Sequence, residues 1–437
     1  MPTEPQAIEG HAGQGGQSPV AGLWRHPDFL KLWAGQTVSL CGSEVTALAL
    51  PLTAVLVLKA GPAQMGLLRA IESVPALLVA LLAGVWVDRV RRRPLLIGAN
   101  LGRAALLGSI PVAASLGLLR LDVLYIVAFA AGTLAVVFSV AYSAFFPSLV
   151  APEHLVEGNT KLEMSRSVAQ IAGTGLGGTL VQLLTAPIAI AVDAFSFVVS
   201  ALSIAAIRAP ETRPAPRGGR RGIQGEIGEG LRVMGGDGLL RALTGSTAVI
   251  NLFAGIQNTL YVLYAIRTLH LSPALLGLVG AVYSACGLLG VVLGGWVVRR
   301  RGVGPTITGA ALLIGVSSLL LPAAAGPSSA SVALFAGGMG LMGIGDAVYN
   351  INASSLRQAI TPRGAQGRVA ASMRMVILGG QVVGAFLGGI LGGWIGLRPM
   401  LAVAGAGMLL GFVWLVLSPA RTLHTIPSRH KTNEGTG

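Results

Sequence analysis

Between two long apolar stretches lies the sequence Gly84-Val85-Trp86-Val87-Asp88-Arg89-Val90-Arg91-Arg92-Arg93, and part of it recurs 210 positions later as Gly294-Gly295-Trp296-Val297-Val298-Arg299-Arg300-Arg301. A second pair of related runs occurs at an offset of 211, namely Gly173-Thr174-Gly175-Leu176-Gly177-Gly178 and Gly384-Ala385-Phe386-Leu387-Gly388-Gly389. Two recurring runs in the same order and at nearly the same spacing indicate an internal duplication. Duplicated halves are common among membrane transport proteins.

The composition is that of a membrane protein. Of 437 residues, 53% are apolar and 11% are charged, and the mean hydropathy is +0.72. These values exclude a soluble globular domain and a disordered chain. The net charge of +14 would suggest a nucleic-acid partner in a soluble protein, but here the arginines gather in short loops between apolar runs. We therefore interpret them as topology signals and lipid-headgroup contacts, and we expect no nucleic-acid binding.

Twelve apolar runs are long enough to cross a membrane, for which a helix needs roughly 20 residues. They cover residues 29–57, 65–87, 94–117, 123–145, 161–184, 187–207, 239–266, 275–298, 305–323, 329–351, 369–394 and 398–418. The sequence therefore predicts an all-α membrane protein with six spans at 28–207 and six at 239–418. Tails are predicted at 1–27 and 419–437, and a linker at 208–238. Within the linker, an amphipathic surface helix is predicted from the spacing of Ile223, Ile227, Leu231 and Met234.

The positions of lysine and arginine predict the orientation. If the amino terminus lies inside, most of these residues fall in inner segments, and the outer loops hold Lys59, Arg120, Arg267 and Arg398. Both termini are then predicted to be cytoplasmic. Residues 1–27 lack the basic and then apolar pattern of a cleaved signal peptide, so we expect the first span to direct insertion. Arginine outnumbers lysine, as in GC-rich bacterial genomes, which favours a bacterial plasma membrane.

The first run resembles a signature of the major facilitator superfamily, Gly-x-x-x-Asp-Arg-x-x-Arg-Arg, found between spans two and three. The resemblance implies two six-helix bundles around a central cavity that opens alternately to each side. It assigns a cytoplasmic gating role to Gly84, Asp88, Arg89, Arg92 and Arg93. Glycine permits close helix packing, aspartate can clamp a helix end, and arginines can anchor at headgroups or pair with carboxylates in one conformation. In the second copy Val298 replaces the aspartate, so we do not assign that copy the same clamp.

The glycine run in span five resembles the antiporter signature Gly-Pro-x-x-Gly-Gly of proton-coupled exporters. Tight helix packing is expected at Gly173, Gly177 and Gly178 and at their counterparts Gly384, Gly388 and Gly389. Thr174 replaces the proline, so the kink of that signature is not expected. Three further runs resemble the branch that contains enterobactin-type siderophore exporters and bacterial drug or macrolide efflux proteins: Trp33-Ala-Gly-Gln-Thr, Leu155-Val-Glu-Gly-Asn and Val192-Asp-Ala-Phe-Ser-Phe. The resemblance favours export over import.

Four carboxylates fall within predicted spans and away from their ends, where a charged acid costs about 2.5 kcal/mol or more and marks a functional candidate. They are Glu44, Glu72, Asp193 and Asp346. We interpret Glu44 as a proton acceptor or cation-binding group, and a carboxyl hydrogen-bonded to a neighbouring helix is the alternative. Arg69 precedes Glu72 by three residues, which predicts a local salt bridge. Asp193 is expected in structural hydrogen bonds, and both cavity and gate roles are open for Asp346.

Other polar side chains complete the predicted site. Thr37 shares a helical face with Glu44, and Gln36 lies on an adjacent polar face. Arg103, deep in span three, is predicted to neutralise Glu44 or another acid. The remaining candidates are Asn251 and Asn258 on one face of span seven, Tyr349 and Asn350 beside Asp346, and Tyr142, which stands in an aromatic stripe that we interpret mainly as a packing surface.

Several functional classes are disfavoured by what the sequence lacks. It has no Cys/His metal spacing, no convergent Ser-His-Asp set and no phosphate-binding loop, so we expect no metal, no cofactor and no enzymatic activity. No histidine falls within a predicted span, so any coupled protons would be carried by carboxylates. The leading hypothesis is a monomeric, proton-coupled antiporter in contact with membrane lipids that exports an amphipathic drug, siderophore or other natural product. A facilitator or uptake carrier of the same fold, and a membrane receptor or lipid scramblase, are the alternatives.

Overall fold

A computed structural model describes residues 22–87, 90–209 and 223–425. The N-terminal bundle consists of α1 (Pro27–Leu52), α2 (Pro62–Val87), α3 (Arg92–Ser115), α4 (Leu121–Leu149), α5 (Leu155–Leu184) and α6 (Ala186–Ala205). The C-terminal bundle consists of α8 (Gly238–Arg267), α9 (Pro273–Arg301), α10 (Val303–Ala323), α11 (Ser329–Ile360), α12 (Gln366–Ile395) and α13 (Leu397–Val416). Between them, α7 (Ile223–Gly236) is the predicted surface helix of the linker.

The all-α, two-bundle prediction is confirmed. Among the described residues, ten helices are long and apolar enough to cross a membrane. The helices α2, with 26 residues, and α5, with 30 residues, are as long as these ten helices and complete the two sets of six. Polar side chains on α5, among them Glu163, Arg166 and Gln170, interrupt its apolar sequence, and all three line cavities described below.

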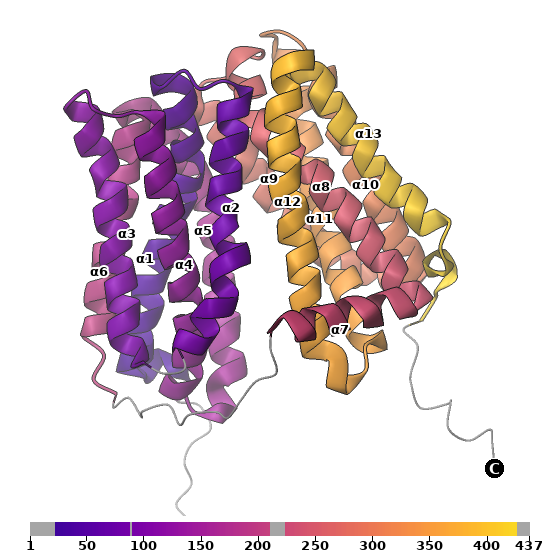
Figure 1. The fold of residues 1–437 in the computed structure, drawn as a ribbon, viewed down its shortest axis with the longest axis horizontal. Coiled ribbons are helices and arrows are strands. Elements are labelled where there is room, and N and C mark those ends of the chain that lie inside the picture. Colours follow the sequence, from indigo (N-terminus) through magenta and orange to yellow (C-terminus); the bar gives the residue numbers. More distant parts are fainter. Residues whose placement is uncertain (1–21, 88–89, 210–222, 426–437) are drawn as a thin grey trace, which may run out of the picture.

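The two bundles have the same packing order. In the N-terminal bundle α1 packs against α5 and α6, and in the C-terminal bundle α8 packs against α12 and α13. Figure 1 shows that α1 begins and α13 ends at one end of the bundles, which we call the terminal end, and the opposite end the distal end. The bundles meet toward the distal end and diverge toward the terminal end, where α7 lies across the C-terminal bundle (Figure 1). An ion pair between Glu229 and Arg368 joins α7 to α12.

Close helix contacts between the bundles occur at four glycines of the distal half. A Cβ atom placed on Gly178 of α5 would lie 2.8 Å from Cα of Gly277 on α9. A Cβ atom on Gly389 of α12 would likewise lie 2.8 Å from Cα of Gly66 on α2. Gly66 and Gly277 are themselves 211 positions apart, as are Gly178 and Gly389, so the duplication produces two related crossings. Small residues are needed there because the backbones touch.

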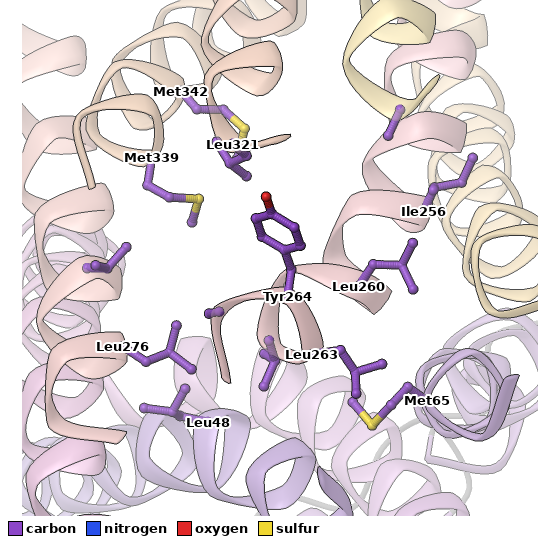
Figure 2. Packing of buried hydrophobic residues seen from close by; sticks show 14 of the residues in the cluster. Leu48, Met65, Ile256, Leu260, Leu263, Tyr264, Leu276, Leu321, Met339 and Met342 are labelled. Atoms are coloured by element: carbon purple, nitrogen blue, oxygen red, sulfur yellow. The ribbon is translucent and has the colours of Figure 1, made fainter. Parts of the chain in front are cut away.

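Hydrogen bonds and apolar contacts reinforce the closure of the distal end. The guanidinium of Arg267, at the end of α8, donates to the carbonyls of Lys59 and Ala60 at 3.2 and 2.7 Å. The backbone N–H of Ala274 donates to the side chain of Gln182 at 3.2 Å. One buried apolar cluster crosses the interface, and Figure 2 shows Leu48 of α1 beside Leu276 of α9. The distal end is therefore sealed by backbone, polar and apolar contacts together.

The start of α1 is held to the end of α6 by a buried carboxylate. Asp28 accepts hydrogen bonds from the backbone N–H groups of Arg208 and Ala209 at 3.2 and 2.9 Å. Its other oxygen lies 2.8 Å from the ammonium group of Lys31. Lys31 in turn donates to the carbonyl of Ala206 at 2.9 Å. These four contacts connect the first and last helices of the N-terminal bundle.

Replacing Asp28 with alanine is expected to destabilise this bundle by about 1–3 kcal/mol, because two backbone donors and one ammonium group lose a charged acceptor. Thermal unfolding of the purified protein in detergent should show a lower midpoint. Asp122→Ala is the matched control, since Asp122 and its partner Arg120 are largely exposed and exposed pairs contribute little. Equal midpoints for the two variants would contradict this role of Asp28.

Candidate functional site

A cavity of about 270 Å³ lies between the two bundles and is lined by side chains from both. We call it the central cavity. Glu44 of α1 and Asp346 of α11 contribute one carboxylate each from opposite bundles. Toward the distal end the wall includes Leu48 and Leu276, which belong to the apolar cluster shared by the bundles. The cavity therefore borders the sealed distal contact.

Glu44 is half-buried in the wall of this cavity. Its position depends on Gly173 of α5, because a Cβ atom there would lie 2.7 Å from Cβ of Glu44. The Glu44 carboxylate makes no hydrogen bond or ion pair with any described residue, although Arg166 is near enough to interact with it electrostatically. An acid in this setting is free to exchange protons or to meet a ligand.

Asp346 is held by an aromatic neighbour. The hydroxyl of Tyr283 on α9 donates to the Asp346 carboxylate at 2.8 Å. Asn350, one turn later on α11, donates to the backbone carbonyl of Asp346 at 2.9 Å and is itself exposed. Among the described residues no basic group lies within ion-pair distance of Asp346. The cavity thus contains two acids whose charges have no direct basic partner in the described chain.

The other two intramembrane acids are engaged elsewhere. Glu72 pairs with Arg69 at 3.1 Å, which confirms the predicted local salt bridge. Asp193 is buried within the N-terminal bundle and accepts from the hydroxyl of Ser196 at 3.0 Å. Neither residue lines the central cavity. Both acids therefore have structural surroundings of the kind expected from the sequence.

The structure brings together some of the remaining predicted residues and separates others. Asn258 joins Glu44 and Asp346 in the central cavity. Thr37 instead donates to the carbonyl of Trp33 in its own helix at 2.7 Å. Tyr349 is buried between the hydroxyls of Thr247 and Ser246 at 3.0 and 3.1 Å. Asn251 accepts from the side chain of Gln381 at 3.1 Å. Thr37, Tyr349 and Asn251 therefore do not line the central cavity.

Gln36, Arg103 and Tyr142 line a second cavity of about 730 Å³ within the N-terminal bundle. We call it the N-bundle cavity. Phe138 also lies in its wall, and its ring stacks on that of Tyr142 with centroids 5.8 Å apart. The aromatic stripe of α4 is therefore both a packing surface and part of a cavity wall.

The predicted gate signature is described in part. Asp88 and Arg89 lie outside the described residues, and Gly84 falls in α2 where the side-chain environment is not described. Arg92 donates to the carbonyl of Ala144 on α4 at 2.9 Å. Arg93 donates to the carbonyls of Ile204 and Ala205 at the end of α6. These two arginines thus join the start of α3 to the terminal ends of α4 and α6.

The glycines of the signature make two kinds of contact in each half of the protein. Gly173 and Gly177 contact α1, and Gly384 and Gly388 contact α8, so these glycines pack within their own bundles. Gly178 and Gly389 contact the opposite bundle. The expected close packing is present, and the last glycine of each run lies at the interface that seals the distal end.

Several residues of the central cavity were not singled out from the sequence. They are Gln170 and Thr174 on α5, Gln257 and Tyr261 on α8, and Tyr283 on α9. Gln170 carried a usable signal, because it precedes Thr174 by one helical turn and recurs 211 positions later as Gln381. Tyr283 carried none, since its hydroxyl acquires a role only through its contact with Asp346 on another helix.

Comparisons with known proteins agree with this architecture. The family model for the Major Facilitator Superfamily matches residues 32–256 and 243–436. An uncharacterized MFS-type transporter of Bacillus subtilis (strain 168), YfiS, is 25% identical over 399 residues, which are 89% of this chain and 92% of that protein.

Solved structures show the same fold. The inward-facing crystal structure of a bacterial homologue of the iron transporter ferroportin has a TM-score of 0.72 at 20% identity, covering 90% of this chain and 98% of that one. Its outward-facing counterpart has a TM-score of 0.58 at 20% identity, covering 89% and 98%. A variant of the nucleoside transporter NupG has a TM-score of 0.74 at 11% identity, covering 89% and 99%.

Proposed function

The chain belongs to the Major Facilitator Superfamily, and we propose that it is a proton-coupled antiporter that exports an amphipathic small molecule by alternating access. The observation that carries the proposal is the Glu44 carboxylate, which faces a cavity shared by both bundles without a hydrogen-bonding or ion-pair partner among the described residues. An acid within the membrane that is accessible and unpaired can bind a proton on one side and release it on the other.

The coupling cycle follows from competition at this carboxylate. We propose that both termini are cytoplasmic, so the distal end faces outside and the structure is closed on that side. In this state substrate enters from the cytoplasm and displaces the proton from Glu44. After the bundles, residues 28–207 and 239–418, have rocked about the cavity, a proton from outside displaces the substrate. Because Glu44 binds either a proton or the substrate and never both, each substrate that leaves is exchanged for a proton that enters down its gradient.

The cavity wall supports an amphipathic substrate. Polar contacts are provided by Glu44, Asp346, Asn258 and the hydroxyls of Tyr261 and Tyr283. Flexible apolar surface is provided by Met339, Met342 and Met408. Methionine side chains adapt to ligands of different shape, which suits a carrier of drugs or other natural products. The glycine signature of α5 and α12 supports export as the direction.

Transport in everted membrane vesicles tests the proposal. A growth-inhibition panel in cells lacking and cells overproducing the protein first identifies a compound to which overproduction gives resistance. Vesicles containing the protein should accumulate that compound when a proton gradient is imposed, and nigericin should stop the accumulation. Accumulation that persists after the gradient has collapsed would rule out proton coupling. Uptake by right-side-out vesicles would establish the alternative of an inward carrier.

A further inference from the structure

The N-bundle cavity is separate from the central cavity along the same two helices. On α1 its wall includes Gln36 and Ser43, whereas Glu44 and Leu48 line the central cavity. On α5 its wall includes Arg166, and the central cavity begins at Gln170. The N-bundle cavity therefore lies on the terminal side, toward which the bundles diverge (Figure 1).

Arg103 of α3 is an unpaired cation in the wall of this cavity. It makes no hydrogen bond and no ion pair with any described residue, and its Nε atom is buried without a partner. The guanidinium lies 3.7 Å from the centroid of the Phe197 ring, and Asp193 acts on it only through longer-range electrostatic attraction. An arginine at this depth is expected to have an anionic partner or a hydrated cavity.

Two further polar atoms in this wall have no partner in the described chain. They are the Oε1 atom of Gln36 and the hydroxyl of Tyr142, and both are buried. Buried polar atoms in folded proteins are normally hydrogen-bonded, so three such atoms around one cavity favour a polar ligand there. Arg166 adds a second positive charge. Its side chain is 60% exposed and forms an ion pair with Glu163 at 3.9 Å.

The wall also has an apolar side. The rings of Phe138 and Tyr142 in this wall are nearly parallel, with an interplanar angle of 22°, and behind the wall Tyr142 also stacks on the buried Phe146, with centroids 6.4 Å apart. The ring edges of Phe138 and Tyr142 that line the cavity can contact a flat apolar group. The cavity volume of about 730 Å³ accommodates a ligand with such a group.

We propose that the N-bundle cavity is a binding site for organic anions that combine an oxyanion, such as a carboxylate or sulfonate, with an aromatic body. The oxyanion is held by Arg103 and Arg166, with the Tyr142 hydroxyl as a further donor, and the aromatic body packs against Phe138. Arginine presents a planar array of donors that matches an oxyanion in two contacts. The site is independent of proton coupling, because it exists in the state that the structure shows and needs no gradient.

Binding to the purified full-length protein tests the site with three probes that share one ring system: 2-naphthoate, 2-naphthamide and 2-naphthylmethylamine. They are negative, neutral and positive at pH 7. Equilibrium dialysis should show that naphthoate binds about tenfold more tightly than the amide, because it adds charge-assisted hydrogen bonds. Arg103→Gln should abolish that preference, and Arg103→Lys should restore part of it, since lysine keeps the charge and loses the planar fork.

Two further variants keep the test decisive if Arg103→Gln does not fold. Arg166→Gln, at a largely exposed position, should weaken naphthoate binding, and Glu163→Gln should strengthen it by removing a competing acid. Arg120→Gln, in a distal loop, should bind naphthoate like the wild type. Equal affinities for naphthoate and naphthamide, or unchanged naphthoate affinity in both Arg103→Gln and Arg166→Gln, would overturn the proposal. Because no gradient is applied, these outcomes leave the coupling role of Glu44 to its own test.

Discussion

The substitution Glu44→Gln should reduce gradient-driven transport to the level of empty liposomes while the exchange of labelled for unlabelled substrate continues. Glutamine keeps the size of the side chain and can still accept a hydrogen bond, but it cannot release a proton. Exchange requires the bundles to rock only while substrate occupies the central cavity, so it does not require titration at this position. The measurement compares both activities in proteoliposomes that contain equal amounts of reconstituted protein.

Two controls separate coupling from folding. Glu153→Gln alters an exposed acid in the short 3-10 helix Pro152–His154 between α4 and α5 and should leave both activities unchanged. Asp346→Asn keeps an acceptor for the Tyr283 hydroxyl, so it should weaken transport without removing its dependence on the gradient. If Glu44→Gln still concentrates substrate against a gradient, another group carries the proton, and the coupling role assigned to Glu44 is wrong.

Most of the fold could be predicted from the sequence because lipid imposes few solutions. A spanning helix must satisfy its backbone internally and be about 20 apolar residues long, so the number of spans follows from hydropathy. The amphipathic helix α7 was predicted from four apolar positions, and Met234 is indeed buried against Val369 and Met373 of α12. How far the bundles open at each end depends on contacts between distant helices, which hydropathy does not encode.

The candidate site was harder to predict, because helical periodicity gives a face but not its neighbour. Thr37 lies on the predicted polar face of α1, yet its hydroxyl is satisfied by the carbonyl of Trp33 one turn earlier. Threonine commonly bonds in this way within helices. Tyr349 shares a helix with Asp346 but turns into the C-terminal bundle. Arg166 was overlooked because it lies in a span with weak apolar character, although it reaches the N-bundle cavity.

The duplication determines the two glycine crossings of the distal end more strictly than it determines the residues of the central cavity. Pro62 and Gly66 on α2 correspond to Pro273 and Gly277 on α9 at the offset of 211, so the two crossings that seal the distal end are built alike. The position corresponding to Glu44 is Gly255, which packs closely against Gln381. The acids of the central cavity are therefore not related by the duplication. We infer that closure needs both halves equally, whereas the chemistry of the cavity is specific to each half.

The substitution Gly389→Val should shift the protein toward a conformation that is open at the distal end. A Cβ atom at this position would lie 2.8 Å from Cα of Gly66 and 3.0 Å from the carbonyl oxygen of Pro62. Both neighbours are backbone atoms, so the clash is relieved by separating α12 from α2 rather than by a rotamer change. Overpacking of this kind costs about 1–3 kcal/mol, which shifts a two-state equilibrium about 5- to 150-fold. Steady-state transport should fall accordingly, because the distal seal forms too rarely.

Electron–electron distance measurements between spin labels at positions 118 and 330 check the expected opening, in a background where Cys41 and Cys286 are replaced by serine. Both positions are exposed at the distal end, one in each bundle. Gly389→Val should lengthen the distance. Gly178→Val should do the same, because its side chain would clash with the backbone of α9 at the related crossing. Gly379→Val on α12 is the matched control, since a Cβ atom there meets no atom within 4 Å. Unchanged distances in both crossing variants would mean that the glycine contacts do not hold the distal end closed.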